Sequence, residues 1–259
     1  MVNTDIGNQR RFTRDTSGGF SGGFTVIEVI LFLAISGLLL FVAIASVTAN
    51  INNSRFNDAI RSTTSYLQTQ YSEVSAGQSD RDTSKGCDTT GSITNSPTAL
   101  GMSDCVVMGR YIKLEGATFT VRYIIGYRAT LLGIPAGDTA AINAMNPQVA
   151  NDAYEGRYDI PWDIHMAKAT ALSGTYDRAG IAIIRSPASG SVLYYVAAPG
   201  DASPAPSIAG TLIRDDNLSQ DVTLCFADDS SSRTGRITIG NGQGQDVIKT
   251  DLATTGACS

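Results

Sequence analysis

The sequence contains a single histidine, His165, among its 259 residues. A Ser–His–Asp hydrolase triad needs a histidine beside an activated nucleophile, and no matching nucleophile motif accompanies this one. His165 lies in the stretch PWDIHMAK with no cysteine nearby, so it also lacks the partners of a metal site. We interpret it as a surface or packing residue, and we expect a protein that is not an enzyme, with no catalytic residue, metal or cofactor.

The chain also has no excess of basic residues. It contains 19 Lys and Arg and 24 Asp and Glu, which gives a net charge of -5 at pH 7. Nucleic-acid binding usually requires a strongly basic face, so the charge balance argues against it. Arg233, Arg236 and Lys249 could contact DNA, but acidic residues lie among them. Lysine is scarce, whereas Ser, Thr, Gly, Asp and Asn are abundant, which suits an exposed, β-rich domain outside the cytoplasm.

Two motifs look like ligand sites only superficially. The stretch GNGQGQ at 240–245 is rich in glycine, but it lacks the Lys and helix that follow a phosphate-binding loop, so we predict a hairpin turn. Asp215 with Asp216, and Asp228 with Asp229, lack the alternating oxygen-ligand spacing of a calcium loop. We predict solvated turns at both pairs.

Proline is absent from positions 24 to 76, and the first half of this segment is almost entirely apolar. Between positions 29 and 49 the only polar residues are Ser36, Ser46 and Thr48. About twenty such residues suffice to cross a bilayer core of ~30 Å as a helix. Arginines precede the run at positions 10, 11 and 14, and the next basic residue is Arg55. The positive-inside rule therefore places the N-terminus in the cytoplasm and residues beyond 50 outside.

An ordinary secretory signal peptide is the alternative for this run, because VTAN, which ends at Asn50, has the small residues that precede a signal-peptidase cut. The apolar region of a signal peptide usually has about 7–15 residues, and this run is longer. A signal peptide also has no use for Glu28, whose carboxylate costs ~2.5–3.5 kcal/mol deep in a membrane on insertion scales. The carboxylate therefore needs a partner.

The stretch GGFTVIEVILFLAISGLLL resembles the processing signal of type IV prepilins and pseudopilins. In that family a prepilin peptidase cuts after a Gly, the next residue becomes an N-methylated N-terminus, and the fifth mature residue is Glu. The resemblance implies a cut between Gly23 and Phe24, methylation of Phe24, and Glu28 as the fifth residue. Ala45 departs from the many pilins that carry a helix-bending Pro at that position.

The motif GGF occurs twice, ending at Phe20 and at Phe24. A cut before Phe20 would make Phe24 the fifth residue and lose the carboxylate, so the second copy is the expected signal and residues 1–23 are the expected leader. The resemblance implies that Glu28 of one subunit attracts the Phe24 amine of its neighbour. Such an offset contact is heterologous, and it builds an open helical filament rather than a closed ring.

Beyond the apolar run, residues 50–77 carry an apolar stripe at helical spacing. Its members are Phe56, Ile60, Thr63, Leu67, Tyr71 and Val74. We predict one helix of about fifty residues, ~80 Å long. Its 24–49 half spans the membrane and takes part in assembly, its 50–77 half is amphipathic and packs on the domain, and Gly77 is a stop signal.

Residues 78–104 are a polar connector, and strand-like runs follow it. The expected strands are 105–114, 117–128, 181–185, 192–198, 222–226, 235–239 and 246–252. We expect burial on both faces at Ile124 and Ile125. We expect an irregular insertion over about 130–180, with a short helix near 138–152.

The predicted fold class is α+β, a pilin-like long N-terminal helix packed on an antiparallel β-sheet domain that extends over 78–259. The resemblance to pilins is strongest over 18–50, extends in coarser form over 51–128, and is faint over 220–259.

Four cysteines follow the apolar run, and an even number outside the cytoplasm indicates two disulfides, with three connectivities open from sequence. Pilins commonly close a C-terminal loop with a disulfide, and the resemblance implies that Cys225 pairs with Cys258. We favour the remaining sequential pair, Cys87 with Cys105, because each bond then closes one irregular loop.

The resemblance implies a structural subunit of a surface filament, and the long mature chain favours a minor subunit. The implied partners are other pilin subunits, a prepilin peptidase and methylase, and an inner-membrane assembly platform. The chain would be a single-pass membrane protein before assembly and part of an extracellular filament afterwards. Other candidates are a pseudopilin of a secretion or DNA-uptake machine, and a signal-anchored enzyme, for which no convergent polar pocket is visible. A binding subunit, such as a tip adhesin or a DNA receptor, is a further candidate. An adhesin would use the insertion, where four aromatic residues cluster: Tyr154, Tyr158, Trp162 and Tyr176.

Overall fold

The computed structural model divides into two compact units, residues 1–50 and 51–259, which are described separately below. The structure describes residues 23–77, 86–87, 93–94, 105–127, 133, 135–150, 155–171, 174–176, 178–197, 208–218, 221–228, 231–240 and 247–252.

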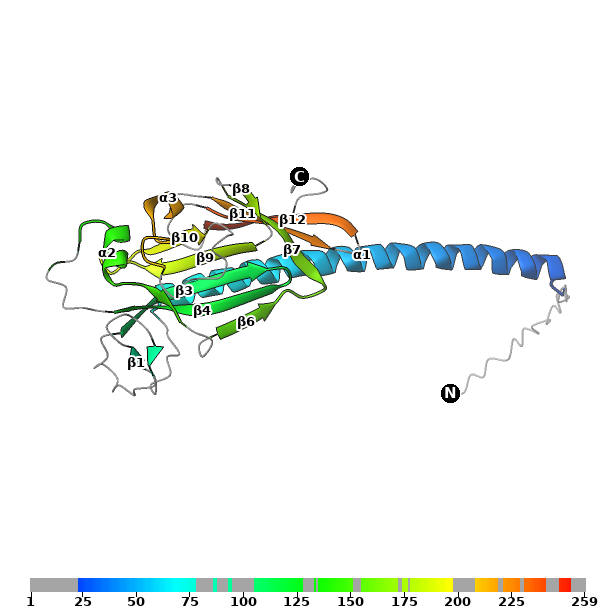
Figure 1. Ribbon diagram of the computed structural model, residues 1–259. Coiled ribbons are helices and arrows are strands. Elements are labelled where there is room, and N and C mark those ends of the chain that lie inside the picture. The colour runs from blue at the N-terminus through cyan, green and yellow to red at the C-terminus, as the bar shows by residue number, and fades with distance from the viewer. Residues whose placement is uncertain are drawn as a thin grey trace, which may run out of the picture. The chain divides into compact units, whose positions relative to one another are not determined.

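Helix α1 runs from Val26 to Ser75 without a break, which confirms the predicted long helix (Figure 1). Its first half, to residue 50, belongs to the first unit and is apolar on all sides. Its large apolar side chains are exposed, as Leu38 at 65% illustrates. This half is long and apolar enough to cross a membrane.

The second half of α1 is amphipathic and supplies one wall of the domain core. All six residues of the predicted stripe are buried, and so are Ala59, Thr64 and Gln70. Hydrogen bonds hold this half to the strands: the Arg110 guanidinium donates to the Gln70 side chain at 2.5 Å, and the Thr64 and Thr250 hydroxyls lie 2.8 Å apart. Arg110 also forms an ion pair with Glu73. The helix ends before Gly77, whose φ of 67° lies in the left-handed region that glycine tolerates.

The first sheet has the antiparallel strand order β10-β9-β3-β4-β5, and β6 also pairs with β4. Its strands are β3 (Cys105–Glu115), β4 (Thr118–Tyr127), β5 (Gln148–Val149), β6 (Glu155–Asp159), β9 (Arg178–Arg185) and β10 (Val192–Ala197). Strands β3 and β4 form a hairpin whose turn contains Gly116 at a φ of 56°.

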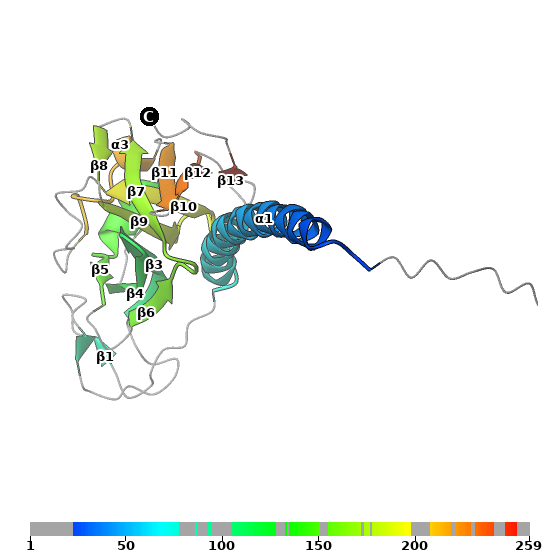
Figure 2. The ribbon, with the colours of Figure 1, turned by 90° about the vertical axis from the view of Figure 1, so that its right-hand side faces the viewer.

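The second sheet has the antiparallel order β13-β12-β11-β7-β8 (Figure 2). Its strands are β7 (Ile164–Ala171), β8 (Gly174–Tyr176), β11 (Val222–Asp228), β12 (Ser231–Ile239) and β13 (Ile248–Asp251). The remaining described elements are β1 (Gly86–Cys87), which pairs with β2 (Ile93–Thr94), and the short helices α2 (Asp138–Ala144) and α3 (Asp215–Leu218). The antiparallel sheets and the long helix confirm an α+β layout.

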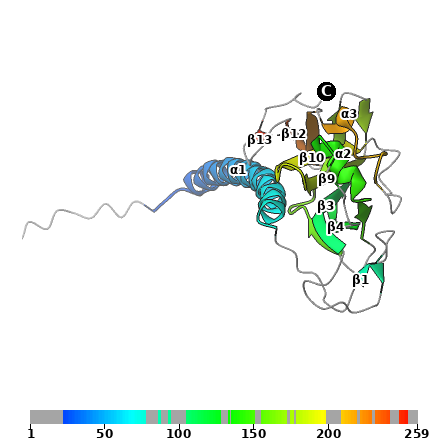
Figure 3. The same cartoon turned by 90° about the vertical axis from the view of Figure 1, so that its left-hand side faces the viewer.

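Two clusters of buried side chains cover opposite faces of the first sheet. One cluster joins α1 to both sheets, with Tyr71 stacked on Tyr194 at 5.4 Å between ring centroids and Phe119 lying 6.5 Å from Phe226 of the second sheet. The other cluster joins this sheet to residues of α2, α3 and 208–213. Figure 3 shows α3 beside β10 of the sheet. The predicted burial on both faces is confirmed, because Ile124 and Ile125 are only 0% and 7% exposed.

The seven predicted strands correspond to β3, β4 and β9–β13, and the pairing of β12 with β13 confirms the strands of the predicted hairpin. The expectation of an irregular insertion over 130–180 is wrong, because β5 to β8 lie there. The short helix expected near 138–152 is present as α2, which is shorter and ends at Ala144. Strand β7 was missed because of a register shift opposite Cys225 and Phe226, which pair with Lys168 and Met166. The extra residue on β7 breaks the alternation of apolar and polar side chains that marks a strand.

Gly109 in β3 is the strand glycine with the tightest surroundings. A Cβ at this position would lie 1.9 Å from the Ile183 carbonyl oxygen, which belongs to the neighbouring backbone and cannot rotate away. We expect Gly109→Ala to lower the free energy of unfolding by about 2–3 kcal/mol. Chemical unfolding of the purified protein in detergent measures this.

Gly156→Ala in β6 is the matched control, because the nearest atoms to its Cβ would be 3.8 Å away. We expect a change within about 0.5 kcal/mol for this variant. Equal destabilisation by the two substitutions would contradict the close approach of β3 and β9.

Candidate functional site

The start of α1 carries a reciprocal pair of caps between Thr25 and Glu28. The Glu28 backbone N–H donates to the Thr25 hydroxyl oxygen at 3.2 Å. In return, the Thr25 backbone N–H and hydroxyl both donate to Oε2 of Glu28, each at 3.0 Å. This is the capping box of a Thr-x-x-Glu sequence, and it satisfies backbone donors that the helix itself leaves without partners.

The capping box leaves room for a second contact of the Glu28 carboxylate. Both bonds from Thr25 end on the same oxygen, Oε2, so an additional donor can approach through Oε1 without breaking the cap. A carboxylate in the first turn also faces the positive end of the helix dipole. The carboxylate is therefore held in place by its own chain, and it can still bind a cation.

Gly23 and Phe24 lie immediately before this cap, and both are exposed. The Phe24 side chain is 84% exposed, and a Cβ built on Gly23 would meet no atom within 4 Å. The structure therefore brings the predicted cleavage position and Glu28 together at an accessible helix start. Cleavage and methylation stay predictions.

The spacing between Phe24 and Glu28 predicted the assembly role of Glu28, but the capping box was not predicted. The signal was present, because Thr25 and Glu28 form the [ST]-x-x-[DE] pattern in front of an apolar run. Glu28 thus has a local structural role as well as the predicted role in assembly. An experiment on Glu28 has to separate the two.

Cys105 and Cys225, the cysteines whose side chains the structure describes, are both disulfide-bonded. Cys105 begins β3 and Cys225 lies in β11, where it is 2% exposed. Cys258 and the side chain of Cys87 lie outside the described residues. The predicted pairing of Cys87 with Cys105 and of Cys225 with Cys258 therefore stays a prediction.

The residues weighed as alternative sites are spread over the domain. His165 is half-buried in β7, opposite Ala227 of β11. Asp215 and Asp216 are exposed, as predicted, but they form the first turn of helix α3 instead of a turn between strands. Arg236 donates to the Asp251 carboxylate at 2.5 Å across β12 and β13, so this cation already has an anionic partner. Asp229 and residues 241–246 lie outside the described residues.

The aromatic residues of the insertion do not form one exposed patch among the side chains described. Tyr158 stacks on Tyr66 of α1 at 4.2 Å, and its hydroxyl lies 3.0 Å from that of Ser62. Trp162, by contrast, is 53% exposed. Tyr154 and the side chain of Tyr176 lie outside the described residues.

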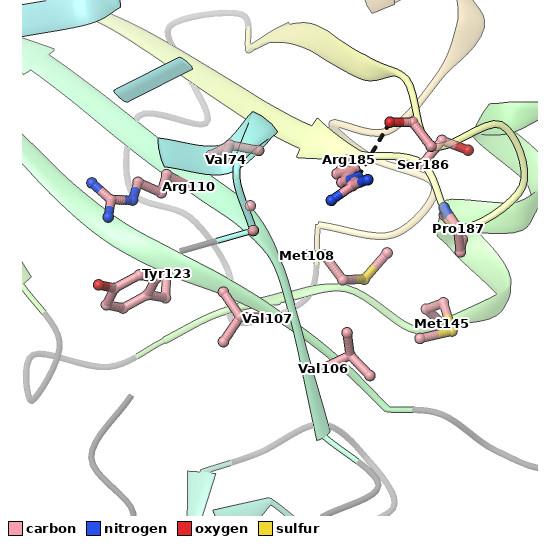
Figure 4. Close-up of a pocket in the computed structure, with 13 residues that line it drawn as sticks. Val74, Val106, Val107, Met108, Arg110, Tyr123, Met145, Arg185, Ser186 and Pro187 are labelled. Carbon is pink, nitrogen blue, oxygen red and sulfur yellow. Dashed lines mark hydrogen bonds between the residues drawn. The ribbon is translucent and has the colours of Figure 1, made fainter. Parts of the chain in front are cut away.

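A cavity of about 380 Å³ lies at the end of the first sheet, between α1, β3 and the turn after β9 (Figure 4). Met108 and Met145 belong to its apolar lining, and Arg110 and Arg185 are the basic residues among its described lining. The Ser186 hydroxyl donates to Asp138 at 2.6 Å, which lowers the pKa of that carboxyl. The described residues that line this cavity include no His, Cys, Asp or Glu.

Comparison with models of known families, with curated proteins and with solved structures gives no match for this chain. Within the part of the chain that the structure describes, no group of three or more His, Cys, Asp and Glu side chains could hold a metal ion.

Proposed function

We propose that this chain is a structural subunit of a type IV pilus-like filament, and that a prepilin peptidase processes it between Gly23 and Phe24. One observation carries the proposal. A capped carboxylate, Glu28, lies four residues after an exposed Gly–Phe bond and at the head of a helix that can cross a membrane. Neither a signal peptide nor a plain membrane anchor requires this combination.

The geometry supports a stepwise route to the filament. The helix has its first hydrogen-bonded residues only after Phe24, so the Gly23–Phe24 bond is open to a peptidase that needs an extended substrate. Cleavage creates an ammonium group on Phe24. In the membrane this new cation and Glu28 each lack water, so pairing them between neighbouring subunits offsets the cost of burying both charges.

The contact between subunits then fixes their offset. The carboxylate and the ammonium group of one chain are separated by four residues, or ~6 Å of helix rise. Each subunit uses Glu28 for one neighbour and Phe24 for another, which continues as an open filament. The domain of α1 and the two sheets stays outside the membrane and forms the surface of the filament.

The function is tested by following the chain in cells that contain or lack a prepilin peptidase. We expect the processed chain in filaments sheared from the surface of peptidase-containing cells, and only the membrane-bound precursor in the others. The measurement is an immunoblot of the sheared and membrane fractions. Processed chain that remains in the envelope after shearing would indicate a pseudopilin instead, and equal chain lengths in both cells would contradict the proposal.

A further inference from the structure

A second cavity, of about 420 Å³, lies beside the residues of α1 that follow its apolar run. Phe56 and Ile164, both buried, form its apolar part, and Trp162 lies at its side. Its polar lining consists of Asn52, Arg55, Asp163 and Asp228. We call this cavity the Trp162 site. It combines one fixed cation, two carboxylates and an aromatic face, so it offers contacts to both ends of a zwitterion.

The backbone at Trp162 is strained. Trp162 and Asp163 have φ angles of 68° and 55°, in the left-handed region that costs free energy for residues with a Cβ. Two glycines, or Asn followed by Gly, would relieve this strain. Such strain persists where the surrounding structure enforces it, and it is concentrated at functional sites.

The neighbouring backbone holds this turn in place. The Ile160 N–H donates to the Ala117 carbonyl at 2.9 Å, and the Met166 N–H donates to the Gly116 carbonyl at 2.8 Å. The turn joins β6 of the first sheet to β7 of the second, so both of its ends are fixed in sheets. Trp162 is thus presented to solvent on a rigid support.

Arg55 lies over the Trp162 ring, with its guanidinium carbon 4.9 Å from the ring centroid. A guanidinium in this position gains a cation–π interaction and loses part of its freedom. Its N–H groups remain able to donate to a phosphate, which guanidinium binds in a bidentate manner. Trp162 therefore orients Arg55, the one basic residue among the described residues that line the site.

The site lies immediately after the apolar run of α1. Ile51 is the last exposed large apolar residue of the helix, at 45%, and Arg55 follows it by four residues, or ~6 Å of helix rise. Tryptophan and arginine at the end of an apolar helix are typical of the membrane–water interface, where lipid headgroups lie. Phospholipid headgroups at that interface carry a phosphate, which is a group that a guanidinium binds in a bidentate manner.

We propose that the Trp162 site binds the phosphoethanolamine headgroup of a membrane phospholipid. The phosphate binds Arg55, and the ammonium group lies between the Trp162 ring and the carboxylates of Asp163 and Asp228. An anionic headgroup with no ammonium fits less well, because it offers no cation to the Trp162 ring and the carboxylates beside it. The proposal rests on the membrane-spanning helix of the proposed function, and the bound lipid would hold the subunit in the bilayer until it is extracted into a filament.

The test uses the fluorescence of Trp162, which is the only tryptophan in the chain. The full chain is reconstituted into phosphatidylglycerol vesicles with and without phosphatidylethanolamine. We expect a blue shift of the emission only when phosphatidylethanolamine is present, because the headgroup displaces water from the ring. In detergent, titration with glycerophosphoethanolamine should give the same shift and should saturate.

Two conservative variants probe the two ends of the ligand. Arg55→Gln removes the phosphate contact, and Asp163→Asn removes one carboxylate while keeping a residue that tolerates positive φ. We expect each to weaken the titration at least about tenfold. Arg157→Gln is the matched control, because this exposed arginine is paired with Asp159 in the adjacent β6 at 2.9 Å, and we expect no change.

Other outcomes would overturn the proposal. An equal shift in vesicles of pure phosphatidylglycerol would show that any bilayer surface suffices, and an unsaturable titration would show that the free headgroup does not bind. Carbonate extraction of the same vesicles separates this proposal from the proposed function. Release of the chain by carbonate would contradict the membrane anchor, whereas a retained chain with an unresponsive Trp162 would contradict the headgroup site alone.

Discussion

Gly23→Leu should leave almost all of the chain as an uncleaved, membrane-retained precursor. In the prepilins that the processing signal resembles, the peptidase cuts after a Gly, and a branched side chain removes both the small size and the backbone freedom of that residue. The substitution should not disturb the structure, because a Cβ at Gly23 meets no atom within 4 Å. The processed fraction is measured by immunoblot and intact mass.

Gly19→Leu is the matched control, since Gly19 holds the same place in the first GGF motif as Gly23 does in the second. We expect normal processing of this variant. Loss of processing in Gly19→Leu with normal processing in Gly23→Leu would move the cut to Phe20. That result would remove Glu28 from the fifth position and with it the proposed assembly contact.

Glu28→Ala should be cleaved normally, accumulate in the membrane and be nearly absent from sheared filaments. The helix becomes more apolar, so insertion is not impaired. In the filament, however, the Phe24 ammonium group of the neighbour would be left without a partner at low dielectric, at a cost of about 3 kcal/mol for each contact. The ratio of filament-bound to membrane-bound chain measures this loss.

Three further variants separate the charge of Glu28 from its capping role. Glu28→Gln keeps the capping box, because Gln can replace Glu there, but it has no charge and should fail like Glu28→Ala. Thr25→Val removes the hydroxyl of the cap, at a cost of about 1 kcal/mol of helix stability, and should assemble nearly normally. Glu28→Asp, one methylene shorter, should lie between wild type and Glu28→Ala. If Thr25→Val fails and Glu28→Gln assembles, the carboxylate acts as a cap and not as an ion-pair partner.

Much of the fold could be predicted from periodicity. The stripe from Phe56 to Val74 has helical spacing, and the absence of proline allowed one uninterrupted helix. Strand β9 is apolar at six consecutive buried positions, which is the pattern of a strand covered on both faces. Both patterns involve residues close together in the sequence, so they can be recognised without knowledge of the tertiary structure.

The elements that were missed depend on distant contacts. Strand β6 is short and largely exposed, and only its pairing with β4 makes it a strand. In β7 the register shift opposite Cys225 and Phe226 disrupts the alternation. The arrangement of the strands into two sheets requires long-range pairing, which no local pattern contains.

The candidate site was predictable to the extent that it is local. Gly23, Phe24 and Glu28 lie within six consecutive residues, at the start of α1 and just before it. The roles of the aromatic residues, by contrast, depend on tertiary structure. Tyr158 and Trp162 lie only four residues apart in the sequence. In the fold, the Tyr66 ring stacks on Tyr158, whereas Trp162 remains exposed. The Trp162 site could not have been predicted, because Arg55 and Trp162 meet only in the folded domain.

The mass of the mature N-terminal peptide tests the central claim most directly. The chain is isolated from membranes or sheared filaments of cells that contain a prepilin peptidase, digested and analysed by mass spectrometry. The account predicts a first residue of Phe24 carrying one added methyl group. A chain that begins at Asn50, at Phe20 or at Met1 would contradict it.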